Sequence, residues 1–432
     1  MTTHAQAGAG GAGPRARTGW GAARAPEVVV TGAGTTNPLG GDLPATWAAV
    51  REGRCAVVAL DEAWVEELAL PVRIGAPLAV DPSQVLGPRE LRRLDRASQC
   101  ALIAAREAWR QAGRPQVDGE RLAVVVSPGM GPVLSVMEAW DTLRERGPRR
   151  VLPTAVPALM PNAPASTVGI ELGAHAGTHA PVSACASGAE AIAVAADLIA
   201  LGRADVVVAG GTDAALHPMT VAAFGAMRAL STRNEDPSTA SRPFAADRDG
   251  FVLGEGAGVV VLESAEHAAA RGAQVLAVLA GAGVTSDGYD VARPEPGGVQ
   301  QERALRLALA RAGIEPDQVV HASAHATSTP VGDVIEAQVL ARTVPGAAVS
   351  ATKSLTGHLL GGAGALEAVL TVMALAEGWA PPTLLPGGID GAVAATGLDV
   401  VGPGGRELPA GGAAVSTSFG FGGHNVALAL TR

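Results

Sequence analysis

The sequence predicts an α/β fold built from two similar halves, and three patterns indicate it. Short apolar runs rich in β-branched residues alternate with stretches in which apolar residues recur three and four positions apart, as expected of strands and helices. This alternation starts again after Glu263. The chain ends with two apolar runs joined by a glycine-rich segment, which predicts a β-hairpin.

The first half, which we place at residues 27–265, begins with an apolar run at 28–30. Near-continuous apolar runs of this kind are typical of strands that are buried on both faces. Further strands are predicted at 122–126, 205–208 and 259–262, and helices at 97–111 and 189–201.

The second half, at residues 266–432, repeats the alternation of strand and helix. Its strands are predicted at 275–279 and near Val319, its helices at 301–312 and 363–376, and the two runs of its hairpin at 413–418 and 426–430. The segment Phe419-Gly-Phe-Gly-Gly-His-Asn425 would form the hairpin turn.

Length and composition limit the class of protein. A chain of 432 residues with 48% hydrophobic residues can bury a large core. Its formal net charge of −9 provides no basic excess for nucleic-acid binding, and no apolar run approaches the length of a membrane span. We therefore expect a soluble enzyme without a nucleic-acid or membrane partner.

Three cysteines, Cys55, Cys100 and Cys185, make no disulfide framework, and their odd number leaves a free thiol in any pairing. A reducing, cytoplasmic location fits this number best. Residues 1–26 are rich in Gly, Ala and Arg but lack the continuous apolar core of a secretory signal. We expect them to form a disordered leader.

The first motif with chemical content is Val182-Ser-Ala-Cys-Ala-Ser-Gly188, in which small residues surround Cys185 just before a predicted helix. Unpaired N–H groups and the dipole at a helix start lower the pKa of a thiol, and small neighbours leave room for an acyl group. A lone cysteine is more often a small buried hydrophobe. The surrounding motif favours a nucleophile here.

Two further motifs each present a histidine in a turn rich in small and hydroxyl residues. His325 lies in Ala324-His-Ala-Thr-Ser-Thr-Pro-Val-Gly-Asp333, and His358 lies in Thr352-Lys-Ser-Leu-Thr-Gly-His-Leu-Leu-Gly-Gly-Ala-Gly-Ala-Leu-Glu367. A single histidine is more often structural than catalytic, although its pKa suits proton transfer. Two of them downstream of the cysteine motif indicate a shared site.

The third motif also holds Lys353, the only lysine among the 32 basic residues. Arginine stands at every other basic position, and the two side chains differ in shape, hydration and hydrogen-bond geometry. We therefore interpret Lys353 as a residue whose compact ammonium group is needed at its site.

In this order, the three motifs resemble the Cys-His-His set of the elongating β-ketoacyl-acyl-carrier-protein synthases of fatty-acid and type II polyketide systems, in the thiolase superfamily. The resemblance covers nearly everything after residue 26. It implies a thiolase-like fold of two mixed-sheet halves in five layers, αβαβα. Further matching segments are Ala229-Leu-Ser-Thr-Arg-Asn234, Ser241-Arg-Pro-Phe244, Asp247-Arg-Asp-Gly-Phe-Val-Leu-Gly-Glu-Gly-Ala-Gly258 and Ser418-Phe-Gly-Phe-Gly-Gly423.

The resemblance implies an acyltransferase that performs a decarboxylative Claisen condensation. Cys185 would take an acyl group from the phosphopantetheine thiol of an acyl carrier protein. Malonyl-carrier protein would then lose CO2 and attack the resulting thioester, giving a β-ketoacyl-carrier protein. His325 and His358 would donate hydrogen bonds to the malonyl thioester oxygen, so each needs a protonated nitrogen that faces it.

Other residues take their roles from the same resemblance. Lys353 would belong to the catalytic set, with Glu367 as its ion partner. The backbone N–H groups of Cys185 and Phe421 would form the oxyanion hole, and Phe421 would also separate the cysteine from the malonyl site. The residues implied in substrate binding are Thr327 and Thr329, which would hold the pantetheine amides, and Met130, which would line the acyl pocket.

The implied partner is the carrier protein, whose acidic helix would meet Arg89, Arg92, Arg93 and Arg228. Only Arg228 is placed by a specific motif, and surface arginines are often simply solvated. No metal and no cofactor other than the carried phosphopantetheine is expected. The chain would form a homodimer, or a heterodimer with a chain-length-factor paralogue.

The main alternative is a non-catalytic chain-length-factor subunit of a synthase heterodimer. Cys185 argues against it, since such subunits characteristically lack the nucleophile. The segment at 287–294 departs from the usual pattern of the family. Together with the extended leader, it favours a specialised polyketide or polyene pathway over fatty-acid synthesis.

Overall fold

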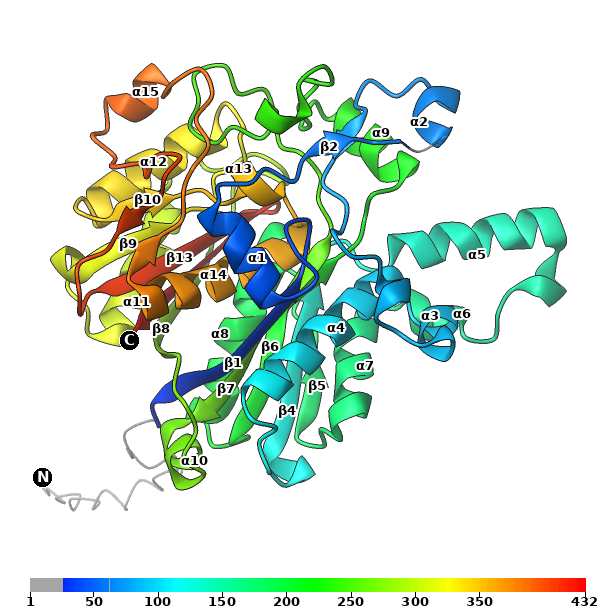
Figure 1. Ribbon diagram of the computed structural model, residues 1–432, viewed down its shortest axis with the longest axis horizontal. Helices are drawn as coiled ribbons and strands as arrows, with labels where there is room; N and C mark the ends of the chain where they lie inside the picture. Colours follow the sequence, from blue (N-terminus) through cyan, green and yellow to red (C-terminus); the bar gives the residue numbers. More distant parts are fainter. Residues whose placement is uncertain (1–25, 62) are drawn as a thin grey trace, which may run out of the picture.

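The computed structural model describes residues 26–61 and 63–432, so the predicted leader lies almost wholly outside the described residues. Ten strands make the main sheet (Figure 1). They are β1 (Val28–Thr36), β4 (Leu122–Pro128), β5 (Gly177–His179), β6 (Val206–Asp213), β7 (Gly256–Ser264), β8 (Ala277–Ser286), β9 (Val319–Ser323), β10 (Ala348–Ser350), β13 (Ala413–Gly420) and β14 (His424–Thr431).

Each half contributes five strands in the same spatial order. The order is β5-β4-β6-β7-β1 in the N-terminal half and β10-β9-β13-β14-β8 in the C-terminal half, so the third strand of each half lies at an outer edge. Both halves are mixed. In the N-terminal half β4 and β6 are parallel while β6 and β7 are antiparallel. In the C-terminal half β9 and β13 are parallel while β13 and β14 are antiparallel. The expectation of two similar mixed-sheet halves is confirmed.

The two halves meet at a short seam. β1 pairs antiparallel with β8 through Val29 with Val278 and Val30 with Ala277, which joins the five-stranded halves into one sheet. The boundary predicted at residues 265 and 266 falls at the start of α10 (Ala265–Ala270), which connects β7 to β8.

Helices form three layers around and between the two halves (Figure 1). The central helices α8 (Ser187–Ala200) and α14 (Ala363–Glu377) pack on strands of both halves and on each other. The helices α4 (Arg96–Gln111) and α7 (Ala163–Leu172) cover the outer face of the N-terminal half. The helices α11 (Val299–Ala312) and α12 (Gly332–Thr343) cover the outer face of the C-terminal half, which completes the expected five layers.

The first strand of each half uses the same glycine pattern to admit an outer helix. A Cβ atom on Gly32 or Gly34 of β1 would lie 2.2–2.3 Å from a backbone carbonyl oxygen of α4. A Cβ atom on Gly281 or Gly283 of β8 would lie 2.3 Å or 1.9 Å from a carbonyl oxygen of α11. Only residues without a Cβ permit this approach. Both strands therefore carry a Gly-Ala-Gly sequence at their helix contact.

The segment Leu360–Glu377, which includes α14, is long and apolar enough to cross a membrane, so the expectation that no apolar run reaches that length is wrong. In the folded chain 83% of this segment is buried inside the protein. A helix that is apolar on all sides is also what the centre of a five-layered fold requires.

The remaining elements extend from this framework, and α5 stands away from the body of the chain (Figure 1). They are the helices α1 (Leu43–Arg51), α2 (Ala63–Glu67), α3 (Pro88–Arg93), α5 (Val133–Arg146), α6 (Ala155–Leu159), α9 (Pro218–Ala226), α13 (Lys353–Thr356) and α15 (Gly391–Ala394), and the short strands β2 (Val58–Ala59), β3 (Ile74–Gly75), β11 (Trp379–Ala380) and β12 (Arg406–Glu407). The predicted C-terminal hairpin is confirmed, with Gly420 opposite His424.

Candidate active site

A cavity of 630 Å³ is lined by residues from both halves. The N-terminal half provides Cys185, Phe224 and Arg228. The C-terminal half provides the two predicted histidines and the glycine-rich hairpin turn. The sequence motifs that lie far apart along the chain therefore meet around one space, as predicted. The residues that bear chemistry there are Cys185, His325, Thr327, Thr329, His358 and Phe421.

Cys185 lies in a 3-10 turn (Ala184–Ala186) that leads directly into α8. Ala184 has φ +51°, a left-handed conformation that residues other than glycine rarely adopt. The hydroxyl of Ser187 holds the turn by donating to the Ala184 carbonyl at 2.7 Å. A Cβ atom on Gly420 would lie 3.2 Å from the Cys185 nitrogen, so the hairpin approaches the nucleophile turn closely. Backbone strain of this kind is characteristic of functional sites.

The Cys185 thiol is buried, and burial raises its pKa to about 11. The Lys353 charge and a hydrogen bond from the Phe421 backbone N–H both lower this pKa but do not offset burial. The sequence expectation that the helix start lowers the thiol pKa is therefore wrong for the unliganded protein, because desolvation of the thiolate outweighs the local donors. The Phe421 N–H nevertheless faces the sulfur, as an oxyanion hole requires.

Alkylation of Cys185 by iodoacetamide should rise about tenfold per pH unit between about pH 7 and pH 9, because only the thiolate reacts and its fraction grows in this proportion below the pKa. Peptide mass spectrometry across this range measures the rate, with a free cysteine peptide as the control, whose rate levels off near its ordinary pKa of about 8.5. A plateau for Cys185 below about pH 8 would contradict the raised pKa.

His325 follows β9, and its backbone is fixed by a buried carboxylate. Glu336 accepts hydrogen bonds from the N–H groups of His325 at 2.8 Å and Ala326 at 2.6 Å. The Lys353 ammonium lies 3.2 Å from Nδ1 of His325. Burial and this charge hold the pKa of His325 well below its ordinary value. An ammonium can only donate, so Nδ1 accepts and the proton of the neutral ring is on Nε2.

His358 lies between α13 and the 3-10 turn at Leu360–Gly362, and its backbone N–H donates to the Val252 carbonyl at 2.8 Å. Its ring packs edge-on against Phe251 and His325, with centroids 5.3 Å and 5.4 Å away. Among the described residues, neither ring nitrogen has a hydrogen-bond partner. Burial holds the pKa of His358 well below its ordinary value, so this ring is also neutral. The ring therefore keeps one N–H available for a ligand.

The Cys185 sulfur and one ring nitrogen from each histidine lie within 4.8 Å of one another. Three such atoms could in principle surround a metal ion. The ammonium of Lys353 beside His325 opposes a cation at this point, because like charges repel strongly where water is excluded. The arrangement instead suits an anion that forms between two N–H donors.

Lys353 is 1% exposed and forms an ion pair with Glu367, which confirms the predicted partner. Burial raises the pKa of Glu367 to about 7, although the Lys353 charge opposes the rise. A buried charge requires such a partner, since removing either member leaves the other uncompensated. The pair thus connects α14 to the ring of His325.

The predicted pantetheine-binding residues also line the cavity. The hydroxyl oxygens of Thr327 and Thr329 lie 3.2 Å apart, on either side of Ser328, which has φ +70°. The Phe421 ring lies 6.5 Å from that of Phe224 across the cavity wall. Two hydroxyls and an aromatic side chain in one narrow space suit an extended arm that contains amides.

Not every predicted residue reaches this cavity. Met130 is 40% exposed and does not line the cavity in the single chain, and its backbone N–H donates to the carboxylate of Asp213 at 3.3 Å. Arg228 lines the mouth. Arg89 and Arg93 line a separate cavity of 750 Å³ between α3 and α7 and do not join Arg228, while Arg92 is an exposed residue of α3.

Two carboxylates that hold the turns of the site were not predicted from the sequence. Both bind backbone N–H groups of segments that lie elsewhere in the sequence. Glu336 lies in α12, beyond the His325 motif, and Asp213 ends β6. Asp213 accepts N–H groups of Gly129 at 2.8 Å and Gly361 at 2.7 Å, and burial raises its pKa to about 7. An acidic residue directly after an apolar strand is the only signal the sequence offers for it.

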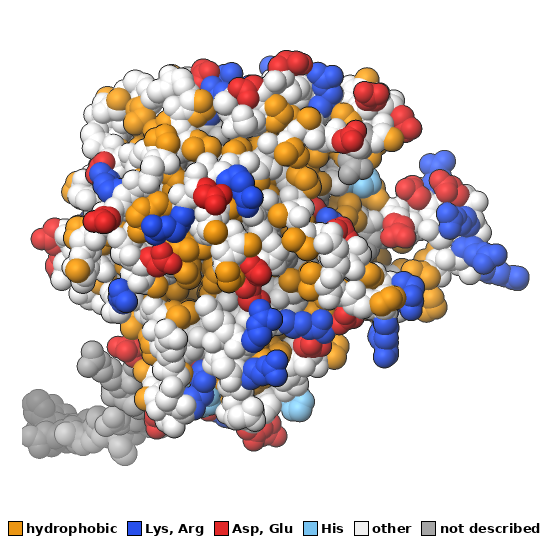
Figure 2. Space-filling view, viewed as in Figure 1, with side chains coloured by type: hydrophobic (Ala, Val, Ile, Leu, Met, Phe, Trp, Pro, Cys, Tyr) orange, Lys and Arg blue, Asp and Glu red, His pale blue; other side chains and the backbone are white. Residues whose placement is uncertain are grey.

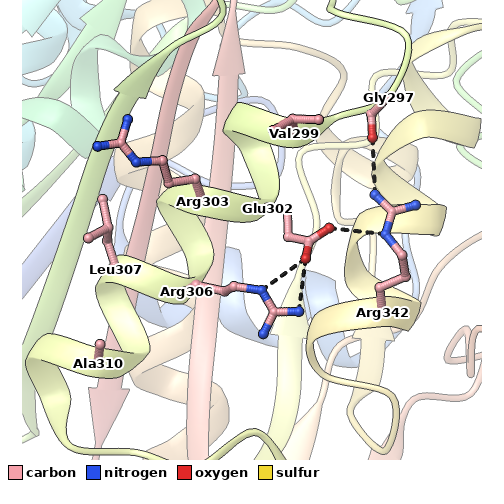
Figure 3. A pocket seen from close by; sticks show the side chains of 8 residues that line it. All are labelled: Gly297, Val299, Glu302, Arg303, Arg306, Leu307, Ala310 and Arg342. Carbon is pink, nitrogen blue, oxygen red and sulfur yellow. Dashed lines mark hydrogen bonds and ion pairs between the residues drawn. The ribbon is translucent and has the colours of Figure 1, made fainter.

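A second groove, of 610 Å³, lies along the outer face of α11 (Figure 3). Glu302 is held there by Arg306 at 2.8 Å and by Arg342 at 3.0 Å, and Arg342 also donates to the Gly297 carbonyl at 3.1 Å. These charges satisfy one another, and none of the predicted catalytic residues lines this groove.

A buried thiol beside two neutral imidazoles and a lysine, in a five-layered fold of two similar halves, defines a thiolase-fold condensing enzyme. The comparisons with known proteins are more specific. Residues 25–268 match the family described as beta-ketoacyl synthase, N-terminal domain, and residues 276–385 match its C-terminal domain. The chain belongs to the β-ketoacyl synthase family.

Curated relatives extend over almost the whole chain. The 3-oxoacyl-[acyl-carrier-protein] synthase 2 of Mycobacterium bovis is 43% identical over 94% of this chain and 97% of its own length. The synthase 2 of Synechocystis is 39% identical over 94% of this chain and 98% of its own. This chain is accordingly an acyltransferase of the condensing class, rather than a chain-length factor. The family uses phosphopantetheine carried by acyl carrier protein and no separate cofactor.

Solved structures agree in fold. A β-ketoacyl synthase from Burkholderia phymatum superposes with a TM-score of 0.85 at 35% identity, covering 94% of this chain and 99% of that one. A type II polyketide ketosynthase in complex with its acyl carrier protein gives 0.85 at 28% identity, with coverage of 94% and 99%. The ishigamide ketosynthase/chain length factor gives 0.85 at 29% identity, with coverage of 95% and 100%.

Proposed function

We propose that Cys185 carries the growing acyl group, that His325 and His358 together stabilise the enolate formed from malonyl-carrier protein, and that Lys353 fixes the ring of His325. The observation that carries this assignment is the cluster of one thiol sulfur and two imidazole nitrogens within 4.8 Å, in a cavity shared by both halves. The Nε2 proton of His325 and the unpaired ring of His358 supply the two donors.

In the loading step, the Cys185 thiolate attacks the carbonyl carbon of the acyl thioester. The resulting oxyanion accepts the N–H groups of Cys185 and Phe421. The carbon–sulfur bond to phosphopantetheine then breaks, its thiol leaves with one proton, and the acyl group stays on Cys185.

In the condensation step, the bond between the malonyl methylene carbon and its carboxylate breaks, and CO2 leaves. The electron pair passes to the thioester oxygen, giving an enolate that His325 and His358 stabilise by N–H donation. The enolate carbon attacks the acyl-Cys185 carbonyl, and the Cys185 thiolate leaves. Neutral rings suit this role, since each donates a hydrogen bond without giving up its proton.

The direct test of this assignment uses the purified protein with acyl-carrier protein and malonyl-carrier protein. β-Ketoacyl-carrier protein and CO2 should form in equal amounts, as measured by mass spectrometry and by trapping of the gas. CO2 release without any β-ketoacyl product in the presence of both substrates would refute the assignment of Cys185 to loading.

Carrier-protein docking at the cavity mouth is a further part of the proposal. Arg228 is exposed and lines the cavity. The family resemblance implies a carrier protein that presents an acidic helix. Opposite charges at an interface rim mainly raise the association rate and orient the partner. Arg89, Arg92 and Arg93 would take part only at the periphery, because they belong to the α3 surface.

Arg228→Glu should raise the KM for acyl-carrier protein by roughly tenfold, with little change for the same acyl group on free pantetheine, because only the protein partner presents the acidic helix. Steady-state loading kinetics with both donors measure the difference. Arg303→Glu, at an exposed position in the groove of Figure 3, is the matched control and should leave both donors unaffected. Equal losses with both donors would place Arg228 in the active site rather than in docking.

A homodimer is the assembly that best accounts for the surface beside β5. This strand ends the sheet and pairs only with β4 among the described strands. The helix α5, which buries none of its residues, projects from the body of the chain (Figures 1 and 2). Nearby exposed apolar residues include Trp140 and Val156, and Ile170 is 84% exposed. A second copy would cover this face and bring Met130 into a buried position. Light scattering of the purified protein measures the mass.

We place the enzyme in the cytoplasm, which the three free cysteines support. The relatives at 39–43% identity carry the name 3-oxoacyl-[acyl-carrier-protein] synthase 2, whereas the type II polyketide ketosynthase and the ishigamide ketosynthase/chain length factor are 28–29% identical. This difference supports linear fatty-acyl substrates over the specialised pathway that the 287–294 segment favours. Gas chromatography of the released chains distinguishes the two.

A further inference from the structure

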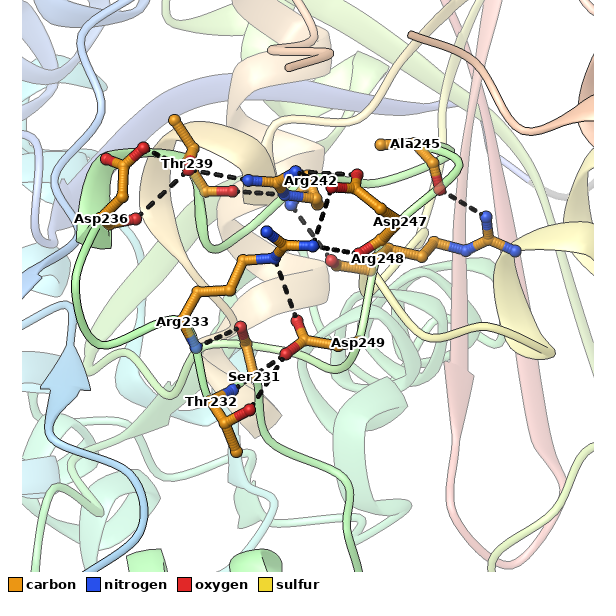
Figure 4. Close-up of polar contacts among 11 residues, drawn as sticks. Ser231, Thr232, Arg233, Asp236, Thr239, Arg242, Ala245, Asp247, Arg248 and Asp249 are labelled. Carbon is orange, nitrogen blue, oxygen red and sulfur yellow. Dashed lines mark hydrogen bonds and ion pairs between the residues drawn. The ribbon is translucent and has the colours of Figure 1, made fainter. Parts of the chain in front are cut away.

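A buried arginine holds the turn that carries the two cavity threonines. Arg248 is 6% exposed, and in Figure 4 its side chain extends away from the cluster around Asp247 and donates to the Ala245 carbonyl. Its Nε donates to the Thr329 carbonyl at 2.9 Å, and one terminal nitrogen donates to the Pro330 carbonyl at 2.6 Å. One planar guanidinium therefore fixes two successive carbonyls of the turn.

Other groups close the same turn from the opposite sides. Asp333 accepts the Thr329 N–H at 3.2 Å and lies 3.5 Å from Nε of Arg248. Ser328, which has φ +70°, is held at both ends, because its hydroxyl accepts the N–H of Arg242 and its carbonyl accepts the N–H of Gly250. These bonds hold the backbone of the turn at Ser328, Thr329 and Pro330, and the hydroxyl-bearing residues of the turn that line the cavity are Thr327 and Thr329.

The left-handed conformation of Ser328 is what places these two hydroxyls 3.2 Å apart on the cavity side. Such a conformation is strained and persists only where surrounding contacts enforce it. Arg248 itself is not among the described residues that line the cavity, so it can act on a ligand only through the turn.

The charge of Arg248 is balanced inside the protein. Asp390 lies 2.9 Å from one terminal nitrogen, and Asp333 is buried on the other side. The guanidinium is therefore held in one orientation, in which its planar fork donates to two carbonyls at once. A lysine at this position would keep the charge but lacks the planar fork, so its single nitrogen could not reproduce the bonds that Arg248 makes to both carbonyls and to Asp390.

We propose that Arg248 is a positioning residue for recognition of the pantetheine arm, acting through the Thr327–Thr329 turn. This inference rests on the proposed function, in which these threonines hydrogen-bond the amides of the arm. It extends that function by separating recognition of the arm from the chemistry at Cys185. Arg248 sets affinity for the arm, while the cysteine and the two histidines set the rate of the chemical steps.

The test compares two acyl donors of equal reactivity. An acyl-pantetheine carries both amides of the arm, whereas an acyl-N-acetylcysteamine carries only the amide nearest the thioester. Intact-mass spectrometry follows acyl transfer to Cys185 from each donor, and the ratio of the two kcat/KM values measures recognition of the outer amide. A general loss of structure lowers both values together and leaves the ratio unchanged.

In Arg248→Lys, the preference for acyl-pantetheine should fall by roughly tenfold, about the factor that corresponds to one ordinary hydrogen bond, with the change in KM rather than in kcat. Transfer from acyl-N-acetylcysteamine should remain within about twofold of wild type. The matched control is Arg233→Lys, since Arg233 belongs to the same polar cluster but contacts Asp247 and Asp249 instead of the turn (Figure 4). This control should keep the wild-type ratio.

An unchanged ratio in folded Arg248→Lys protein would overturn the proposal, as would a wild-type enzyme that shows no preference between the two donors. Wild-type protein that accepts neither donor at Cys185 would overturn the proposed function itself. If Arg248→Lys does not fold, as judged by circular dichroism, the ratio of the two kcat/KM values is measured on Asp390→Asn instead. It removes one anchor of the guanidinium and should lower the same ratio by a few-fold, and an unchanged ratio there would also refute the positioning role.

Discussion

Cys185→Ala protein should gain no acyl adduct from acyl-carrier protein and form no β-ketoacyl product, a loss of at least about a thousandfold, because Cys185 is the only thiol among the described residues that line the cavity. The fold should survive, since the change removes one buried sulfur from a turn that is held by the Ser187 hydroxyl rather than by the thiol. The expected cost in stability is about 1 kcal/mol, typical of a small truncation.

Intact-mass spectrometry after incubation with acyl-carrier protein measures the loss of the adduct, and thermal unfolding measures the fold. Cys100→Ala is the matched control, because Cys100 is an equally buried cysteine in α4 that does not line the cavity. This control should load at the wild-type rate. An acyl adduct on Cys185→Ala at the wild-type rate would remove Cys185 from the mechanism.

Lys353→Arg should lower malonyl decarboxylation about a hundredfold while loading of Cys185 falls much less, because a misplacement of about 1 Å near the reacting atoms can cost this factor. Lys353 is among the largest fully buried side chains, and its ammonium lies between Glu367 and Nδ1 of His325. A guanidinium is wider and planar, so it cannot occupy this space without moving one of the two.

Loading depends mainly on the thiolate and on the N–H groups of Cys185 and Phe421, none of which contacts Lys353 directly. Both half-reactions therefore have to be measured on the same folded protein, with thermal unfolding as the control. Wild-type rates in both half-reactions would show that Lys353, the only lysine of the chain, has no catalytic role.

The central elements could be predicted from sequence because their signals are local. The apolar runs at β1, β4, β6 and β7 and the helices α4 and α11 come within a few residues of their predicted positions, although β1 and β6 run further than their apolar cores. The strands β5 and β10 are only three residues long and lack such runs, and they were not predicted. The two Gly-Ala-Gly sequences were visible, but their meaning depends on where α4 and α11 pack.

Sequence could predict which residues meet at the centre of the site, but it could not predict their pKa values. The motifs indicate which side chains meet, because Cys185, His325 and His358 each follow a recognisable turn. The pKa of Cys185 depends on how much water the folded cavity excludes, which no local pattern reports. The side-chain carboxylates of Asp213 and Glu336 bind backbone N–H groups of the turns from other elements and carry no motif of their own. Arg248 lies in the matching segment 247–258, but that segment does not report which turn its side chain holds.

The equal strand order of the two halves has a consequence for the origin of the site. Cys185 stands at the start of α8, after the third strand of its half, and His358 stands before α14, after the third strand of the other. The thiol and the imidazole thus occupy the same place in two copies of one unit, as gene duplication followed by divergence would leave them. In the proposed mechanism, one copy alone would hold either the group that loads the chain or a group that activates the extender, so carbon–carbon bond formation would need both copies in one chain.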